Sequence, residues 1–369
     1  MPSGITAIGT ANPPFQLKQQ DAAEIITSRF YLTPAQKKIL KRIYTSSGIE
    51  QRYSVLADYG NTSNAFVFFP NDPSDHFPTT AQRMAIYKAH ALTLALAAID
   101  DCLTHVNNVC ITHVITVSCT GMYAPGIDID IVQKLNLASS TKRTSINFMG
   151  CYGAFNGMKV ADAICCADPH ATVLLVCVEL CSIHIQKEFT YDHIISSAIF
   201  ADGAAAILIQ RQHANVQKQL CFKSFYCDIV PETSQDMAWH IGDSGFDMIL
   251  SAYVPQAIQS GIAAFTQRLL RQSNQSLSDI DYFAIHPGGL KILQACEASF
   301  NITPHDNRFS YDVLRQYGNM SSATVLFVLK KIWNALSTED NHRTLFSCAF
   351  GPGLTLESML LEVVLTGTK

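Results

Sequence analysis

The stretch RTSINFMGCYGAFNGMKVADAIC (143–165) decides how this chain folds around its most informative residue, Cys151. Residues 144–149 read as a strand, and residues 154–165 have helical spacing. Cys151 is therefore predicted to lie at a strand-to-helix turn. The side of this helix that we predict to be buried carries Phe155, Met158, Ala161 and Ala163.

A thiol at the start of a helix lies beside unpaired backbone N–H groups and the positive end of the helix dipole, which favour thiolate over thiol. Gly150 and Gly153 flank the thiol and allow a sharp turn and close approach of a substrate. We therefore predict that Cys151 is a nucleophile with a pKa below the value of about 8.5 for free cysteine. The alternative is a buried structural cysteine, since the chain has 12 of them.

The second half of the chain repeats the pattern of the first. Residues 113–121 and 282–289 both read as a strand that ends in a loop. Cys119 precedes Cys151 by 32 residues, and His286 precedes Asn319 by 33. Residues 290–300 are predicted to be helical, and Gly318-Asn319 opens a second predicted helix, MSSATVLFVLKKIW (320–333). Each half then closes with a glycine-containing strand entry, FADGAAAILI (200–209) and AFGPGLTLESMLL (349–361).

This repetition predicts two copies of one βαβ-containing unit. The polar segment 210–219 separates them, so we expect one half over residues 1–212 and the other over residues 213–369. Equivalent strand or helix ends of the two copies would bring Cys151, His286 and Asn319 together between the halves.

The three side chains form a coherent chemical set. His286 could hold Cys151 as a thiolate in an ion pair and donate a hydrogen bond to a thioester oxygen, and the Asn319 amide is a neutral donor for an oxyanion or enolate. The structural alternatives are a core histidine for His286 and a helix N-cap for Asn319.

Seven segments along the whole chain carry a family resemblance. The chain resembles the type III polyketide synthases, the chalcone and stilbene synthase family, which have the thiolase fold. The segments are AIGTANPP (7–14), GCYGAFNG (150–157), VCVELCS (176–182), FADGAAA (200–206), IHPGG (285–289), YGNMSSATVLFVL (317–329) and FGPGLTLES (350–358). The resemblance implies an α/β fold with two duplicated halves in a layered αβαβα architecture.

The resemblance also implies roles for individual residues. The family's catalytic triad falls on Cys151, His286 and Asn319, and its gatekeeper phenylalanine falls on Phe200. The turn that shapes the cavity floor falls on Gly351, Pro352 and Gly353.

Several positions depart from the plant enzymes of the family. Trp239 replaces a glycine, Cys119 a threonine, and Ala124 a methionine that crosses the dimer interface. Either Phe246 or Met248 occupies the place of the second gatekeeper phenylalanine. These changes indicate a microbial synthase with a small aliphatic or malonyl starter, if Trp239 lines the cavity rather than packing in the core or at the dimer interface.

A coenzyme A site is expected at the predicted amphipathic helix 35–44 and at Gly288 and Gly289. Arg42 matches a coenzyme A-contacting arginine of the family, whereas Ile39 and Ser46 stand where plant enzymes have lysines. Lys38 and Lys41 are candidate replacements, and the alternative is a solvated basic helix face.

The activity that the resemblance implies is iterative decarboxylative Claisen condensation of malonyl-CoA onto an acyl-CoA starter, followed by cyclisation. We expect a homodimer that needs no metal or redox cofactor. The alternatives are a ketoacyl-carrier-protein synthase III-like enzyme with a single condensation, a Cys-His-Asn protease and a non-catalytic interaction protein.

Composition and the absence of certain motifs exclude several other classes of protein. The 369 residues are 48% hydrophobic and 15% charged with a net charge of −4, which argues against disorder and against a nucleic-acid partner. The sequence contains no P-loop motif and no dinucleotide-binding glycine motif. Its start, MPSGITAIGT, lacks the pattern of a signal peptide, and no apolar run reaches membrane-spanning length. With 12 cysteines and no C-x₂-C spacing for zinc, we expect reduced thiols in the cytoplasm.

Overall fold

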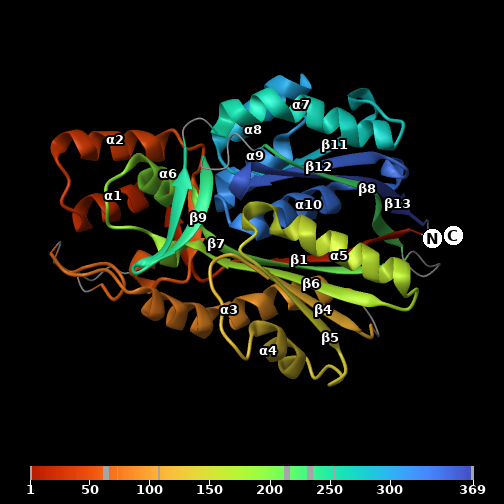
Figure 1. The fold of residues 1–369 in the computed structure, drawn as a ribbon, viewed down its shortest axis with the longest axis horizontal. Coiled ribbons are helices and arrows are strands. Elements are labelled where there is room, and N and C mark those ends of the chain that lie inside the picture. The colour runs from red at the N-terminus through yellow and green to blue at the C-terminus, as the bar shows by residue number, and fades with distance from the viewer. Residues whose placement is uncertain are drawn as a thin grey trace.

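The computed structural model describes residues 2–60, 66–72, 74–106, 109–211, 217–230, 236–251 and 254–366. Helices and sheet alternate in five layers, with a helical layer between the two halves of the sheet and helices on both outer faces (Figure 1). The predicted αβαβα layering of a thiolase-like fold is therefore confirmed.

Both halves of the chain contribute strands in the same order. The first half supplies β1 (Ser3–Ala11), β7 (Asp202–Arg211), β6 (Thr172–Leu180), β4 (His113–Ser118) and β5 (Lys142–Asn147). The second half supplies β8 (Lys218–Ile229), β13 (Thr355–Leu365), β12 (Thr344–Gly351) and β11 (Tyr282–Ile285). In each half the first two pairings are antiparallel and the third is parallel, as the duplicated sequence pattern predicts.

The two halves meet where β1 pairs with β8. Among the described residues, the pairs Gly4 with Cys221 and Ile5 with Leu220 join them into one nine-stranded sheet. β7 ends at Arg211 and β8 begins at Lys218, and the expected boundary between residues 212 and 213 lies outside the described residues.

The helices fill the three helical layers and one end of the molecule (Figure 1). The central layer contains α5 (Gly153–Ala167) and α10 (Thr324–Ala335). The outer layers contain α3 (Thr80–Leu103) and α4 (Ile127–Lys134) on one side, and α7 (Val254–Gln272) and α8 (Leu290–Phe300) on the other. α9 (Arg308–Tyr317) packs against α10.

A smaller group of elements lies at the end of the molecule that Figure 1 shows on the left. Its helices are α1 (Gln19–Arg29), α2 (Pro34–Thr45) and α6 (Tyr191–Ile199). Its strands form two antiparallel pairs: β2 (Phe15–Lys18) with β3 (Gln51–Ser54), and β9 (Met237–Gly242) with β10 (Gly245–Leu250), the second being a hairpin. No helix in the described ranges has the length and apolar character that crossing a membrane requires.

The central helix α5 shows how sequence spacing sets the packing. Phe155, Met158 and Ala161 are fully buried, as predicted, but Ala163 is exposed and Cys165 takes the buried position instead. Since successive residues rotate by about 100° around a helix, a residue four positions after Ala161 returns to the buried face, whereas one two positions after it does not.

Gly9 offers a test of the tight packing between β1 and α3. A Cβ atom at Gly9 would lie 2.1 Å from the Cys102 backbone nitrogen and 2.2 Å from the Ala98 carbonyl oxygen, so Gly9→Ala must force the two elements apart. We expect a loss of about 1–3 kcal/mol in the free energy of unfolding, measured by urea denaturation.

Gly261, within α7, is the matched control. Apart from its chain neighbours and the backbone of its own helix, no atom of the described residues lies within 4 Å of the place that a Cβ atom would take there. Gly261→Ala should raise stability by up to about 1 kcal/mol, the difference in helix propensity between the two residues. Similar effects of both substitutions would contradict the close contact at Gly9.

Candidate active site

Cys151, His286 and Asn319 line one small cavity of ≈40 Å³, which we call the catalytic cavity. Cys151 lies in the 3-10 turn before α5, and Asn319 lies two residues before the equivalent turn, Ser321–Ala323, which precedes α10. His286 follows β11 as Cys119 follows the equivalent strand β4. The duplication therefore brings the three predicted residues together from both halves of the chain.

The loop that carries Cys151 is fixed on two sides. Gly150 has φ = +75°, and its backbone N–H donates to Cys119 Sγ at 3.0 Å. A Cβ atom at Gly150 would lie 2.3 Å from Cδ of Pro352, so glycine allows the 350–353 turn to pack against the nucleophile loop. Pro352 and Cys119 both line the catalytic cavity, as predicted for substrate-cavity residues.

Glycines of that turn act through packing rather than by lining the cavity. A Cβ atom at Gly351 would lie 2.5 Å from the Tyr152 ring, and Gly353 has φ = +84°. Neither is among the residues that line the catalytic cavity, whereas Phe350 and Pro352 are.

Hydrogen bonds fix which way the Asn319 amide points. Its Oδ1 accepts from the Ser321 backbone N–H at 2.9 Å and from the Thr324 hydroxyl at 3.3 Å. The Nδ2 group therefore faces Gly288 O at 3.4 Å and Cys151 Sγ at 3.8 Å. The oxygen of Asn319 thus caps the following turn, while Cys151 Sγ lies beside the whole amide, 3.8 Å from Nδ2 and 3.9 Å from Oδ1.

The backbone of Asn319 holds the predicted gatekeeper. Asn319 N donates to Ile199 O at 2.8 Å, and Ala201 N donates to Asn319 O at 2.9 Å, which forms a parallel bridge between Asn319 and Phe200. Phe200 lines the catalytic cavity at this bridge.

His286 is 1% exposed, and neither of its ring nitrogens has a hydrogen-bond partner in the described structure. Burial lowers the pKa of His286 to about 3, so the imidazole is neutral. Burial likewise raises the pKa of the Cys151 thiol to about 12, and the hydrogen bond from Asn319 opposes this only in part.

The predicted thiolate with a depressed pKa, paired with a protonated His286, is therefore wrong for the substrate-free site. The loss of hydration on burial outweighs the favourable position of the thiol before α5. The site instead contains a neutral thiol, a neutral imidazole and a neutral amide.

Glu179 is a buried carboxylate next to the last residue of the largely apolar strand β6. It accepts hydrogen bonds from the Cys119 backbone N–H at 2.9 Å, from the Thr120 hydroxyl at 2.8 Å and from the Ser322 hydroxyl. Burial raises its pKa to about 7. Glu179 therefore links a loop of the first half to a loop of the second. A single glutamate in an apolar strand is the sequence feature that could have identified this residue.

Comparison with known proteins agrees with this geometry. The family model for the N-terminal domain of chalcone and stilbene synthases matches residues 2–212, and the model for their C-terminal domain matches residues 222–365. This chain belongs to the chalcone and stilbene synthase family.

Individual relatives cover nearly the whole synthase. It is 30% identical over 365 residues to the alpha-pyrone synthesis polyketide synthase-like Pks18 of Mycobacterium tuberculosis, covering 98% of this chain and 91% of the relative. It is 30% identical to a putative chalcone synthase of Bacillus subtilis, covering 97% and 98% of the two chains. The type III polyketide synthase domain of Steely1 from Dictyostelium superposes with a TM-score of 0.91 at 30% identity, covering 99% of this chain and 100% of that one.

Trp239 of this synthase lines the catalytic cavity, the first of the two placements considered for it. Its indole N–H donates to the Cys119 carbonyl oxygen at 2.8 Å, which fixes the orientation of the ring. Across the β9–β10 hairpin it pairs with Met248, which also lines the cavity. Of the two candidates for the second gatekeeper position, Phe246 does not border the catalytic cavity.

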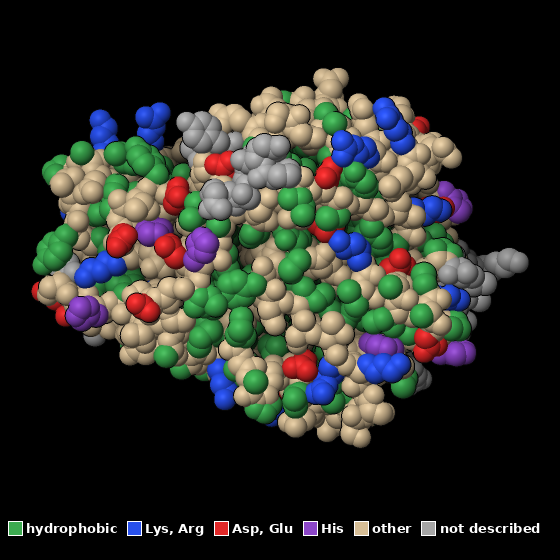
Figure 2. Space-filling view, viewed as in Figure 1, with side chains coloured by type: hydrophobic (Ala, Val, Ile, Leu, Met, Phe, Trp, Pro, Cys, Tyr) green, Lys and Arg blue, Asp and Glu red, His purple; other side chains and the backbone are tan. Residues whose placement is uncertain are grey.

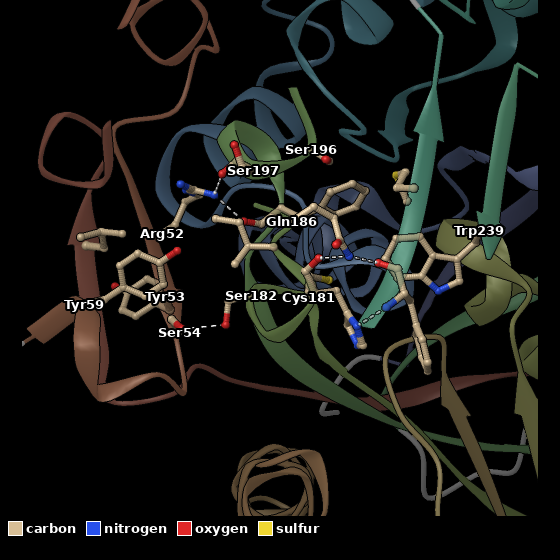
Figure 3. A pocket seen from close by; sticks show the side chains of 16 residues that line it. Arg52, Tyr53, Ser54, Tyr59, Cys181, Ser182, Gln186, Ser196, Ser197 and Trp239 are labelled. Atoms are coloured by element: carbon tan, nitrogen blue, oxygen red, sulfur yellow. Dashed lines mark hydrogen bonds between the residues drawn. The ribbon is translucent and has the colours of Figure 1, made fainter. Parts of the chain in front are cut away.

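Phe246 instead lines a second cavity of ≈40 Å³, which we call the rear chamber (Figure 3). There its ring stacks on His184 with centroids 4.2 Å apart, and its backbone N–H donates to His184 Nδ1 at 2.9 Å. His184 Nε2 lies 2.6 Å from the Thr120 carbonyl oxygen, so this imidazole links the hairpin to the cavity wall. The sequence analysis gave no role to His184.

A third, largely apolar cavity of ≈200 Å³ adjoins the catalytic cavity, and the two share Ile199, Leu250, Gly288 and Ile292. Gly289 and Lys291 also line it, but Arg42 does not. Basic side chains project from the edge of the molecule where α2 lies (Figure 2). The coenzyme A role of Arg42 stays a prediction, and Lys291 is a cation at the cavity mouth that the sequence analysis missed.

The neutral state of the nucleophile predicts the pH dependence of its alkylation. Because burial raises the pKa of Cys151, the rate constant of iodoacetamide inactivation of the substrate-free synthase should keep rising above pH ~8.5 without reaching a plateau. His286→Ala should show the same profile. Peptide mass mapping separates Cys151 from the exposed Cys110, Cys166 and Cys227.

A plateau with a midpoint below pH ~8.5 that disappears in His286→Ala would contradict the neutral pair. It would show that the imidazolium and thiolate form together before substrate binds.

Proposed function

We propose that this type III polyketide synthase carries its growing chain on Cys151 and forms the malonyl-derived enolate against Asn319 and His286. The observation that carries the proposal is the fixed Asn319 amide, whose Nδ2 lies 3.8 Å from Cys151 Sγ in the cavity that His286 also lines. The family assignment favours repeated condensation over the single condensation of a ketoacyl-carrier-protein synthase III-like enzyme.

Acylation begins with a neutral thiol, since burial raises the Cys151 pKa. The thiol sulfur attacks the acyl carbon of the starter thioester, and its proton leaves as the C–S bond forms. His286 is a suitable acceptor, because its ring nitrogens have no partner among the described residues. The proton then passes to the departing coenzyme A sulfur.

Condensation requires donors for an oxygen that becomes negative. Malonyl-CoA loses CO₂, and the resulting enolate oxygen accepts hydrogen bonds from Asn319 Nδ2 and from the N–H of the neutral His286 ring. The enolate carbon attacks the Cys151 thioester, and the sulfur leaves as thiolate. The lengthened chain on coenzyme A returns to Cys151 for the next round.

The substrates in this proposal are malonyl-CoA and an acyl-CoA starter, and coenzyme A acts as carrier and leaving group. The chemistry uses only these side chains and requires neither a metal nor a redox cofactor. The apolar cavity beside Gly288, with Lys291 at its mouth, suits the pantetheine arm and a phosphate of coenzyme A.

A small or malonyl starter fits the catalytic cavity, because Trp239 occupies part of its wall and the cavity volume is only ≈40 Å³. We further propose a homodimer, since β5 ends the sheet as an edge strand with mostly exposed residues. The 12 free cysteines favour a reducing compartment, the cytoplasm.

Two substitutions separate the roles of nucleophile and enolate donor. Cys151→Ala should abolish polyketide formation but keep slow decarboxylation of malonyl-CoA, because the donors remain. Asn319→Ala should lose decarboxylation by about 10²–10³-fold while still forming an acyl adduct on Cys151. Polyketide formation is measured by product analysis, decarboxylation by CO₂ release, and the acyl adduct by the mass of the intact protein.

Near-normal product formation by Cys151→Ala would show that Cys151 is not the nucleophile. An unchanged decarboxylation rate in Asn319→Ala would show that Asn319 does not stabilise the enolate.

Trp239 provides a test of starter size. Trp239→Gly removes an indole from the cavity wall and should raise kcat/KM for a bulky aromatic acyl-CoA, while turnover of malonyl-CoA alone falls. Steady-state kinetics with both substrates measures the change. If kcat/KM for the aromatic starter stays flat and only thermal stability drops, the indole acts as a packing residue and does not limit starter size.

A further inference from the structure

The catalytic cavity and the rear chamber share one wall. Cys181, Phe200, Trp239 and Met248 line both cavities. Trp239 is held by its side-chain bond to Cys119 O, and Cys181 is almost completely buried. The backbone of Phe200 is held by its bridge to Asn319. Met248 has an unbranched, flexible side chain and is only half-buried, so its rotation is the easiest way to join the two spaces.

The far side of the rear chamber is rich in oxygen and nitrogen atoms. Figure 3 shows Arg52, Tyr53, Ser54 and Tyr59 on the side opposite Trp239. Three further hydroxyls, those of Ser182, Ser196 and Ser197, belong to the lining. Most of these hydroxyls already have partners within the protein: Ser54 bonds to Ser182, Ser182 to Asp202, Ser196 to Asp192 O and Ser197 to Ile194 O. The case against a plain alkyl chain therefore rests on the charged group of the chamber, since an alkyl chain offers no acceptor to it.

Arg52 is the charged group of this chamber and lacks a carboxylate partner among the described residues. It is 5% exposed, and none of the ion pairs that those residues form includes it. Its Nη1 donates to the carbonyl oxygens of Ser197 at 2.7 Å and Phe200 at 2.5 Å, but its Nε has no partner in the same part of the chain. A buried cation of this kind favours an anionic or carbonyl oxygen beside it.

Two other buried residues show whether Arg52 already has a charged partner: Asp202, a possible partner, and Arg83, a second buried arginine. Asp202 is buried nearby, but its carboxylate accepts from the Ser182 backbone N–H at 2.7 Å, the Ser182 hydroxyl at 2.6 Å and the Val55 N–H at 2.8 Å. Arg83 is another buried arginine outside the ion pairs of the described residues; it donates to three carbonyl oxygens and lies against two aromatic rings, and its Nη2 has no partner among those residues. Arg52 likewise lies over one ring, that of Tyr44, so the two arginines differ chiefly in what they border. Arg83 lines neither cavity, so its role is structural, whereas Arg52 borders open space.

We propose that the rear chamber binds the distal, oxygen-bearing end of the acyl chain held on Cys151, and that Arg52 selects chains whose end carries a carboxylate or ketone oxygen. This specificity rests on the proposed function, since it requires a chain on Cys151. Met248 turns aside as the chain passes from one cavity to the other. Starters derived from malonyl units carry such oxygens, whereas fatty acyl starters do not.

The test uses matched six-carbon starters with the full-length synthase. Adipoyl-CoA ends in a carboxylate, 5-oxohexanoyl-CoA carries a ketone, and hexanoyl-CoA ends in a methyl group. We expect kcat/KM to be highest for adipoyl-CoA, intermediate for 5-oxohexanoyl-CoA and lowest for hexanoyl-CoA. A wild-type preference for hexanoyl-CoA over both oxygenated starters would overturn the proposal and favour an alkyl-binding chamber.

Substitution of Arg52 separates recognition from support of Phe200. Arg52→Met should lower the adipoyl-to-hexanoyl ratio of kcat/KM by about 10- to 100-fold, the range for a lost hydrogen bond to a charged group. Arg52→Lys, which keeps the charge, should restore part of that ratio. Equal losses for both starters would mean that Arg52 only holds the Phe200 carbonyl, and the proposal would fail.

Met248→Trp provides an independent measurement if Arg52→Met does not fold. A larger, stiffer side chain should close the shared wall and bring the three starters to within about threefold of one another. Persistence of the adipoyl preference in Met248→Trp would overturn the route through this wall. Malonyl-CoA decarboxylation in the same preparations reports on Asn319 and His286, so a failure of the proposed catalysis is distinguished from a failure of this specificity.

Discussion

The bridge between Phe200 and Asn319 is the interaction on which the arrangement of this site depends. It joins a residue that follows α6 in the first half to a residue that precedes α10 in the second, through backbone hydrogen bonds at 2.8 and 2.9 Å. Arg52 adds a third contact by donating to the Phe200 carbonyl. Since all of these groups are buried, breaking any of them leaves polar atoms without partners. The backbone of Phe200 and the Asn319 residue are therefore held as one unit.

The fold was predicted well from the sequence, because the duplication shows in the spacing of strands, loops and helices along each half. The similar spacings from Cys119 to Cys151 (32 residues) and from His286 to Asn319 (33 residues) reflect the same βαβ path in each half, and the strand orders of the two halves agree. The helix predicted over residues 290–300 has those bounds in the structure. Ala163 was placed wrongly because an amphipathic pattern of small residues leaves the edge of the buried face poorly defined.

The surroundings of the site were harder to predict, because they depend on contacts between distant parts of the chain. The indole of Trp239 bonds to Cys119 O across 120 positions of sequence, and His184 meets Phe246 across 62. Nothing in the local sequence distinguishes Met248 from Phe246 as the residue at the catalytic cavity. Lys291 and Arg52 also come to line cavities only because helices and strands that are distant in the sequence pack together in the folded chain.

The pKa values were the clearest failure of local reasoning, and burial is the physical cause. A helix N-terminus stabilises a thiolate by a modest amount, whereas removing a charge from water costs more unless an opposite charge lies beside it. The same burial acts on both partners, raising the pKa of Cys151 and lowering that of His286. Either charge alone is therefore disfavoured in the closed cavity, but the two together attract each other strongly at low dielectric. Proton transfer from sulfur to imidazole is thus favoured only while bond formation to an acyl carbon consumes the negative charge. At neutral pH such a thiol therefore reacts slowly with small electrophiles until a thioester enters the cavity.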